Sequence, residues 1–283
     1  MKKILYLITI AGLLIGTVAC GDDEPKRGNG TFTVKTPMIN HMYDTQSDNI
    51  VGLAKTHNRL TIDTIRHTAS LELVYNDGSE KTLKLDDLKA TPKRLGFYEL
   101  SSASYSQFSG YVDFNESSMR YRYITAEGLR VISTISDVFF LDTKSTIAYD
   151  DTTKTTVMEG TMYQFTVDPA SLKAIVKVMG ILHAKDWKYF INVTGNSVPV
   201  TLTRNGYTIS GENIKTNATY RSQSSDSTHI NPYPSYESTD KYPFKTFNAT
   251  VDLSNDHLDA TYMLGGSATV TATGRTYPDY SAY

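Results

Sequence analysis

The sequence has one cysteine, Cys20, among its 283 residues. An intramolecular disulfide is therefore excluded, and the fold must depend on its core alone, even outside the cytoplasm. The chain also lacks a cluster of basic residues, and its formal net charge is −2. Because phosphate backbones are bound by concentrated lysine and arginine, nucleic acid is not expected as a partner.

Common catalytic motifs are missing as well. The sequence contains no G-x-S-x-G, no G-x-x-x-x-G-K-[ST] and no H-E-x-x-H. Its six histidines show no zinc spacing, so neither a metal site nor a cofactor is expected. We therefore expect no enzymatic activity. A hydrolase using two of the 30 acidic residues stays open, because sequence spacing does not reveal which carboxylates face each other.

What is present is the composition of a β protein. Hydrophobic residues make up 40% of the chain and charged residues 20%, as in soluble globular proteins. The 20 tyrosines, together with frequent threonine, valine and isoleucine, favour strands over helices.

The N-terminus has the layout of a secretory signal. A basic start, "MKK", precedes the apolar run "ILYLITIAGLLIG", and the small residues "TVA" lead to Cys20. The apolar run is shorter than the roughly 20 residues that a membrane-spanning helix needs. Residues 1–19 are therefore predicted to be a cleaved signal peptide.

This signal and Cys20 resemble the lipobox of bacterial lipoproteins of the Bacteroidota type, although Thr17 stands where that family usually has leucine. The resemblance implies that the Cys20 thiol receives a diacylglyceryl group and that the new N-terminus is acylated, which gives a stable membrane anchor. The alternative is an ordinary cleaved signal that leaves Cys20 free.

The residues after Cys20 resemble the acidic export signal of the same lipoproteins. They are Gly21, Asp22, Asp23 and Glu24. The resemblance implies an outer-membrane protein facing the extracellular side, with residues 20–29 as a lipidated tether. A merely solvated, charged tether is the competing interpretation.

Alternating apolar and polar residues predict strands through most of the chain after the tether. One segment instead predicts a short helix, "DPASLKAIVKVMGIL". Asp168 is placed to cap it, and Leu172, Ile175, Val176 and Met179 follow helical spacing. A buried strand is the alternative for this segment, because several of its residues are β-branched.

An internal repeat suggests two related domains. Residues Val112–Ser133 align without a gap with Val251–Ala272, and Thr82–Lys89 matches Thr208–Lys215. The offset grows from 126 to 139 residues between these blocks, so the second copy is expected to carry about 13 extra residues near 221–243. Chance similarity between ordinary hairpins is the alternative.

The expected fold is all-β with one short helix, in two tandem sandwich- or barrel-like domains that arose by duplication. The domains are expected at residues 30–150 and 160–283, with the polar stretch Tyr149–Thr156 as a linker.

The candidate ligand-binding residues lie in an aromatic, proline-rich insertion of the second domain. They are Tyr233, Tyr236, Tyr242 and Phe244. Tyrosine offers a flat apolar face and a hydroxyl group, which suits sugars, peptides and protein surfaces. These rings could instead fold back and seal one end of the domain.

The sequence therefore favours a surface-anchored, non-catalytic binding or adhesion module for a glycan, peptide or protein. Two alternatives stay open: a structural subunit of a surface assembly or transporter accessory protein, and a lipocalin-like carrier of small molecules.

Overall fold

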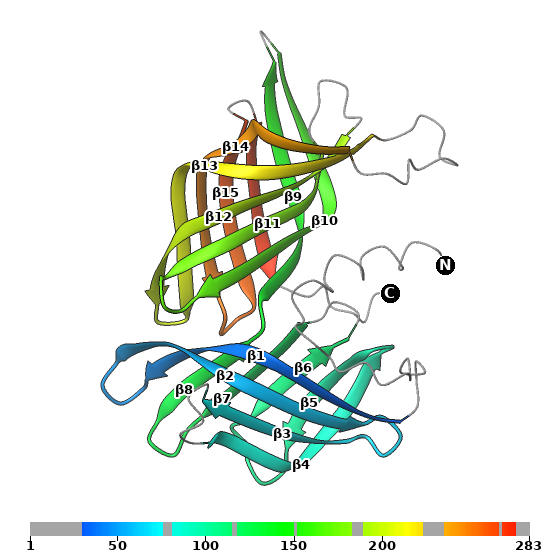
Figure 1. Ribbon diagram of the computed structural model, residues 1–283, viewed down its shortest axis with the longest axis vertical. Helices are drawn as coiled ribbons and strands as arrows, with labels where there is room; N and C mark the ends of the chain where they lie inside the picture. The colour runs from blue at the N-terminus through cyan, green and yellow to red at the C-terminus, as the bar shows by residue number, and fades with distance from the viewer. Residues whose placement is uncertain are drawn as a thin grey trace. The chain divides into compact units, whose positions relative to one another are not determined.

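The computed structural model describes residues 30–75, 81–114, 118–149, 152–182, 189–222, 235–265 and 268–275. The chain divides into two units between Ser136 and Asp137, and each unit is a closed barrel of eight antiparallel strands (Figure 1). The expected all-β fold with two tandem domains is confirmed, and both domains are barrels rather than sandwiches.

Barrel 1 is an up-and-down meander in which each strand pairs with the next and β1 closes against β8. Its strands are β1 (Thr31–Asp44), β2 (Asn49–Asp63), β3 (Thr68–Tyr75), β4 (Lys81–Arg94), β5 (Phe97–Ser102), β6 (Ser109–Asp113), β7 (Ser118–Ile124) and β8 (Leu129–Thr134).

Barrel 2 repeats this plan and closes through the pairing of its first strand with its last. Its strands are β9 (Asp137–Tyr149), β10 (Thr152–Asp168), β11 (Lys173–Leu182), β12 (Tyr189–Thr203), β13 (Gly206–Ser222), β14 (Ser235–Asp252), β15 (His257–Leu264) and β16 (Ala268–Arg275).

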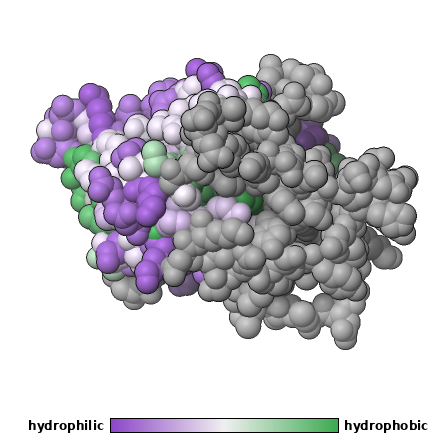
Figure 2. Space-filling model, turned by 90° about the horizontal axis from the view of Figure 1, so that it is seen from above, coloured by the Kyte–Doolittle hydropathy of each residue, from purple (hydrophilic) through white to green (hydrophobic). Residues whose placement is uncertain are grey.

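The period-2 pattern of the sequence separates the inside of each barrel from the outside. In β15, Leu258, Ala260, Tyr262 and Leu264 are buried, while the residues between them are exposed or half-buried. Successive side chains of a strand point to opposite faces, so one register puts all four inside. Hydrophilic residues predominate on the coloured part of the surface in Figure 2.

The interior of barrel 1 contains a hydrogen-bonded polar cluster among its apolar side chains. The Ser133 hydroxyl donates to Asn40 Oδ1 at 2.6 Å, and the Tyr121 hydroxyl donates to Asn58 Oδ1 at 3.2 Å. All four side chains are buried, and burial raises the pKa of Tyr121 well above its ordinary value. Buried polar groups with satisfied hydrogen bonds fix how a core packs.

Barrel 2 is filled by aromatic side chains. Phe165, Phe247 and Tyr262 form a chain of ring contacts, with centroids 6.4 Å apart for Phe165–Phe247 and 5.5 Å for Phe247–Tyr262. Tyr163 extends it, since its ring lies 6.4 Å from that of Tyr262. These four rings are fully buried. An interior occupied by large side chains argues against the lipocalin-like carrier.

The predicted helix is wrong, because Lys173–Leu182 forms strand β11 between β10 and β12. Ala174, Val176 and Val178 are buried at every second position, which is the period of a strand. Ile175 on the other face is half-buried, so apolar residues stand on both faces and imitate helical spacing. The buried strand, which was the alternative for this segment, is the observed structure.

Asp168 caps a turn rather than a helix, and three other hairpins share its construction. In each, an aspartate at a strand end accepts hydrogen bonds from the backbone N–H groups two and three residues later. The residue four positions on has left-handed backbone geometry. The aspartates are Asp44, Asp63, Asp168 and Asp252, and the left-handed residues are Asp48, His67, Leu172 and Asp256.

The boundary between the domains lies earlier than the expected 150/160. Strand β9 belongs to barrel 2, and Tyr149 pairs with Thr152 in the β9–β10 hairpin. The polar stretch expected to link the domains is therefore largely hairpin. A solvent-facing hairpin rich in threonine is as polar as a linker, so composition alone did not separate the two.

The second repeat block aligns equivalent strands. Val112 pairs with Met119 across β6–β7, and their counterparts Val251 and Leu258 pair across β14–β15. All four side chains are buried. The first repeat block does not align equivalent strands. Thr82–Lys89 lies in the fourth strand of barrel 1, whereas Thr208–Lys215 lies in the fifth strand of barrel 2.

Candidate functional site

The second barrel has a long hairpin where the first has a short one. Strands β5 and β6 have 6 and 5 residues, whereas the equivalent strands β13 and β14 have 17 and 18. Pairing between β13 and β14 continues out to Tyr220 and Ser235. In the stretch 221–243, expected to hold the extra residues, Arg221 and Ser222 end β13 and Ser235 begins β14.

The four predicted ligand-binding residues do not form one exposed group. Tyr233 lies outside the described residues, and Tyr236 lies in β14 opposite Thr219. Tyr242 is half-buried. Its carbonyl oxygen accepts a hydrogen bond from Thr216 Oγ1 at 2.6 Å, which ties this part of β14 to β13.

Phe244 is a core residue and not a ligand platform. Its side chain is 0% exposed, and its ring centroid lies 5.0 Å from that of Phe247 and 5.4 Å from that of Tyr262. The Phe244 ring thus folds back into the domain, which was the alternative to ligand binding. The period of β14 buries Phe247, Ala249 and Val251, and an irregularity in its pairing with β15 between Phe244 and Thr246 brings Phe244 to the same side.

A break in the barrel wall lies beside Phe244. The β12–β13 ladder runs to Gly195↔Thr216 and resumes only at Val200↔Ile209. Four residues of β12 and six of β13 therefore have no partner across this pair of strands. Ser197 and Asn213, one in each unpaired segment, have left-handed φ values of 57° and 49°. Such geometry in a strand marks a bulge that bends the backbone out of the ladder.

The break forms a groove of about 430 Å³. Its lining residues are Asn196, Ser197, Pro199, Gly211, Glu212, Ile214, Lys215, Thr216 and Asn217. We refer to this feature as the wall groove. Its volume falls within the range of small-molecule sites in proteins.

Two glycines let the floor of the wall groove pack closely. A Cβ atom on Gly195 would lie 3.2 Å from both Ile214 Cγ2 and the Phe244 ring. A Cβ atom on Gly211 would lie 3.1 Å from Ile214 Cδ1. Ile214 thus fits between the two backbones and separates the wall groove from the aromatic core behind it.

The rim of the wall groove is exposed and polar. Asn196, Asn217 and Ser197 offer donors and acceptors, while Glu212 only accepts and Lys215 only donates. The rim therefore offers both donors and acceptors to a ligand with hydroxyl or amide groups. Its two charged groups have opposite sign, so it does not select an anion or a cation by net charge.

A bulge of β14 borders the same region. Pairing with β13 passes from Ile214↔Phe244 to Thr216↔Thr239, so residues 240–243 have one counterpart, Lys215. The Thr216–Tyr242 hydrogen bond spans this bulge. This hydrogen bond places the Tyr242 backbone beside Thr216, which lines the wall groove.

Sequence reasoning missed the wall groove, although a signal was present. The segments "TGNSVP" in β12 and "SGEN" in β13 place glycine, asparagine and proline inside strands. These residues weaken a regular ladder and mark bulges. Both segments lie inside single long strands, and the break between these strands was not foreseen.

The remaining predictions for sites concern other parts of the chain. Cys20, Gly21, Asp22, Asp23 and Glu24 lie outside the described residues. Among the residues that are described, no group of three or more histidine, cysteine or acidic side chains could hold a metal ion. The same residues include no helix with the length and hydropathy to cross a membrane.

Comparison with protein-family models and with curated proteins found no match. Among solved structures, the chain is similar to isotype 1 transferrin binding protein B (TbpB) from serogroup B Neisseria meningitidis. The sequences are 8% identical over 88% of this chain and 77% of that one, with a TM-score of 0.22. At this TM-score the similarity carries no argument about ligand or function.

Proposed function

We propose that this protein is a non-catalytic binding protein, anchored to the outer membrane through lipidated Cys20 and facing the extracellular side. We place its ligand site in the wall groove of barrel 2. The single observation that carries this proposal is the interruption of the β12–β13 ladder. A closed barrel gains stability from continuous pairing, and a break that contains two left-handed residues costs stability.

The break also supplies the chemistry of a site. Four residues of β12 and six of β13 lack ladder partners across the break, and the polar side chains of Asn196 and Asn217 line it. Such groups bind ligands that have many hydrogen-bonding atoms and little charge. A hydroxyl-rich ligand of the oligosaccharide class fits best.

Binding by the wall groove is tested with the protein from residue 21 onward, on an array of glycans. A double variant, Asn196→Ala with Asn217→Ala, removes two amides from the rim. We expect its affinity for a bound glycan to fall at least tenfold, since each lost hydrogen bond costs about 1 kcal/mol. Asn49→Ala, an exposed asparagine of barrel 1, is the matched control.

Retention of full affinity by the double variant would overturn the wall groove as the site. A wild-type protein that binds no glycan but co-purifies with a partner from detergent extracts would favour the structural-subunit alternative. The anchor is tested separately by the mass of the mature N-terminus, where an unmodified Cys20 thiol would contradict it.

A further inference from the structure

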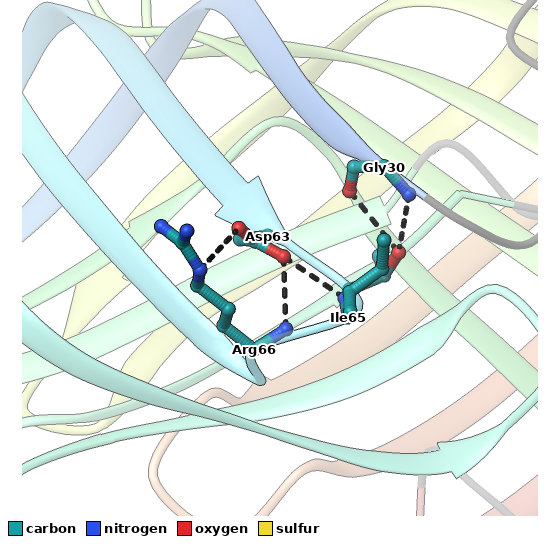
Figure 3. Close-up of polar contacts among 5 residues, drawn as sticks. Gly30, Asp63, Ile65 and Arg66 are labelled. Atoms are coloured by element: carbon teal, nitrogen blue, oxygen red, sulfur yellow. Dashed lines mark hydrogen bonds and ion pairs between the residues drawn. The ribbon is translucent and has the colours of Figure 1, made fainter.

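One rim of barrel 1 holds the point where the described chain begins. The Gly30 N–H donates to Thr64 Oγ1 at 3.1 Å, and the Thr64 N–H donates to the Gly30 carbonyl at 3.0 Å (Figure 3). The Thr64 hydroxyl donates to the same carbonyl at 3.1 Å. These bonds fix the start of the barrel against the β2–β3 turn.

Because the barrel is a meander, alternate turns lie at the same rim. The β2–β3 turn, Thr64–His67, and the β4–β5 turn, Leu95–Gly96, therefore share the rim of Gly30. We call these residues the N-terminal rim. The opposite rim carries the β1–β2 turn, Thr45–Asp48, and the β7–β8 turn, Thr125–Gly128.

The N-terminal rim presents the two most exposed large apolar side chains of the described residues. Leu95 is 72% exposed and Ile65 is 65% exposed. Ile65 is held in this position by the turn, because Asp63 Oδ1 accepts hydrogen bonds from the N–H groups of Ile65 and Arg66, both at 2.9 Å. Exposed apolar side chains on rigid turns mark a contact surface rather than a fraying loop.

Cations flank these two side chains. The Arg66 side chain is 82% exposed and lies 3.9 Å from Asp63, which is a weak pair in water. Lys93 is 44% exposed and lies 2.9 Å from Glu99. Apolar tips beside arginine and lysine match a phospholipid surface, where acyl chains lie beneath anionic head groups.

The turns at the opposite rim of barrel 1 carry acidic side chains. Its described turn residues, 45–48, 103–108 and 125–128, include Asp48 and Glu127 and no lysine or arginine. Hydrogen bonding to Ser47 and to backbone N–H groups lowers the pKa of Asp44, and hydrogen bonding to Thr125 lowers that of Glu127. Both carboxyl groups therefore carry charge at neutral pH, and Arg130 in β8, whose guanidinium lies over the Tyr43 ring, is a cation beside these turns.

We propose that the N-terminal rim of barrel 1 docks on a phospholipid surface, with Ile65 and Leu95 in the interface and Arg66 and Lys93 at the head groups. The inference rests on the proposed anchor at Cys20. Nine residues lie between Cys20 and Gly30, so the ten steps from one to the other reach at most about 35 Å. The anchor raises the local concentration of the rim at the membrane, where two apolar tips alone would bind weakly.

The test uses the full-length lipidated protein in vesicles of phosphatidylcholine with phosphatidylglycerol. Single cysteines are introduced by Ile65→Cys, Leu95→Cys and, as the matched control at the opposite rim, Ile50→Cys. Ile50 is also an exposed apolar residue, at 41%. Each variant is labelled with an environment-sensitive maleimide dye, and doxyl-labelled lipids serve as quenchers.

We expect dyes at positions 65 and 95 to be quenched at least twofold more than a dye at position 50. Equal quenching at all three positions, or none at 65 and 95, overturns the docking. The wild-type protein separates this result from the anchor, because lipidated Cys20 takes up no dye. A wild-type chain that is labelled at Cys20 overturns the anchor and, with it, the docking.

Discussion

The Tyr207 hydroxyl donates a hydrogen bond of 2.5 Å to Asp137 Oδ2, joining the fifth strand of barrel 2 to its first. Both side chains are buried, at 2% and 3% exposure. A short bond between buried groups distant in sequence constrains how the barrel closes. Asp137 is also the residue at which the second unit begins, so this contact fixes the start of barrel 2.

Tyr207→Phe is therefore expected to destabilise barrel 2 by about 1.5–3 kcal/mol, the usual worth of a hydrogen bond to a charged group. Urea unfolding followed by circular dichroism measures the change. Tyr98→Phe, a buried tyrosine of barrel 1, is the control and leaves the barrel 2 transition in place. An unchanged midpoint in Tyr207→Phe would show that the bond contributes nothing to closure.

A second prediction concerns Gly206, at the start of β13. A Cβ atom there would lie 2.1 Å from the Val251 carbonyl oxygen and 3.1 Å from the Leu253 nitrogen. Both atoms belong to the backbone of the neighbouring segment, so no side-chain rotation relieves the clash. Gly206→Ala is expected to cost about 3 kcal/mol in unfolding free energy.

Gly211→Ala is the matched control for Gly206→Ala. Its Cβ atom would meet Ile214 Cδ1 at 3.1 Å, the end of a side chain that can rotate. Thermal unfolding of the two variants side by side compares a backbone clash with a side-chain clash. Equal losses in both would contradict the close approach of β14 to Gly206.

A third prediction follows from the assignment of Phe244 to the core. Removing this ring leaves a cavity against Phe247 and Tyr262, and Phe244→Ala is expected to cost about 3–5 kcal/mol. Phe244→Leu keeps most of the volume and should lose less. A Phe244→Ala protein as stable as the wild type would return this residue to the list of ligand-contact candidates.

The strands were predictable because the alternation of apolar and polar residues shows which side chains face inward. This holds whether the strands form a sandwich or a barrel. The pairing of Val112 with Met119 and of Val251 with Leu258 follows from that alternation and from equal turn lengths. The choice of barrel over sandwich was not predictable, because both bury one face of every strand. It depends on whether the first and last strands pair, which no local pattern encodes.

The wall groove was beyond sequence reasoning for a related reason. Whether Ser197 and Asn213 interrupt a ladder depends on which residues lie across from them, and register is a property of two strands together. For the aromatic residues, the sequence predicted a shared role that the structure does not give them. Phe244 and Tyr242 are two positions apart in one strand, yet one is buried in the core and the other half-buried beside a bulge.

Acid stability provides a fourth prediction. The pKa of Asp44 is lowered by Ser47 and by two backbone N–H groups, that of Asp63 mainly by the Arg66 backbone, and that of Asp87 by Ser104. A carboxyl group with a lower pKa in the folded state stabilises it above the unfolded pKa, near 4, and loses that effect as pH falls. Barrel 1 should thus become less stable below about pH 4.

The acid prediction is checked by thermal unfolding between neutral pH and acid. Asp44→Asn removes one titrating group and should flatten the profile in that window, while its midpoint at neutral pH falls toward the acid value of the wild type. A wild-type midpoint that does not change on acidification would contradict the role of these turn carboxylates.

Alkaline pH tests the interiors of both barrels. Burial is the largest cause that raises the pKa values of Tyr121, Tyr163 and Tyr262 above the ordinary value of 10.0. A group whose pKa is raised by folding stabilises the folded state below its unfolded pKa, and this stabilisation is lost as pH rises toward the folded value. Absorbance at 295 nm should therefore show these three tyrosines ionising only together with the loss of β structure. Ionisation of every tyrosine near pH 10 with the circular dichroism unchanged would mean that water reaches both interiors. The barrels would then not be filled by the side chains described above.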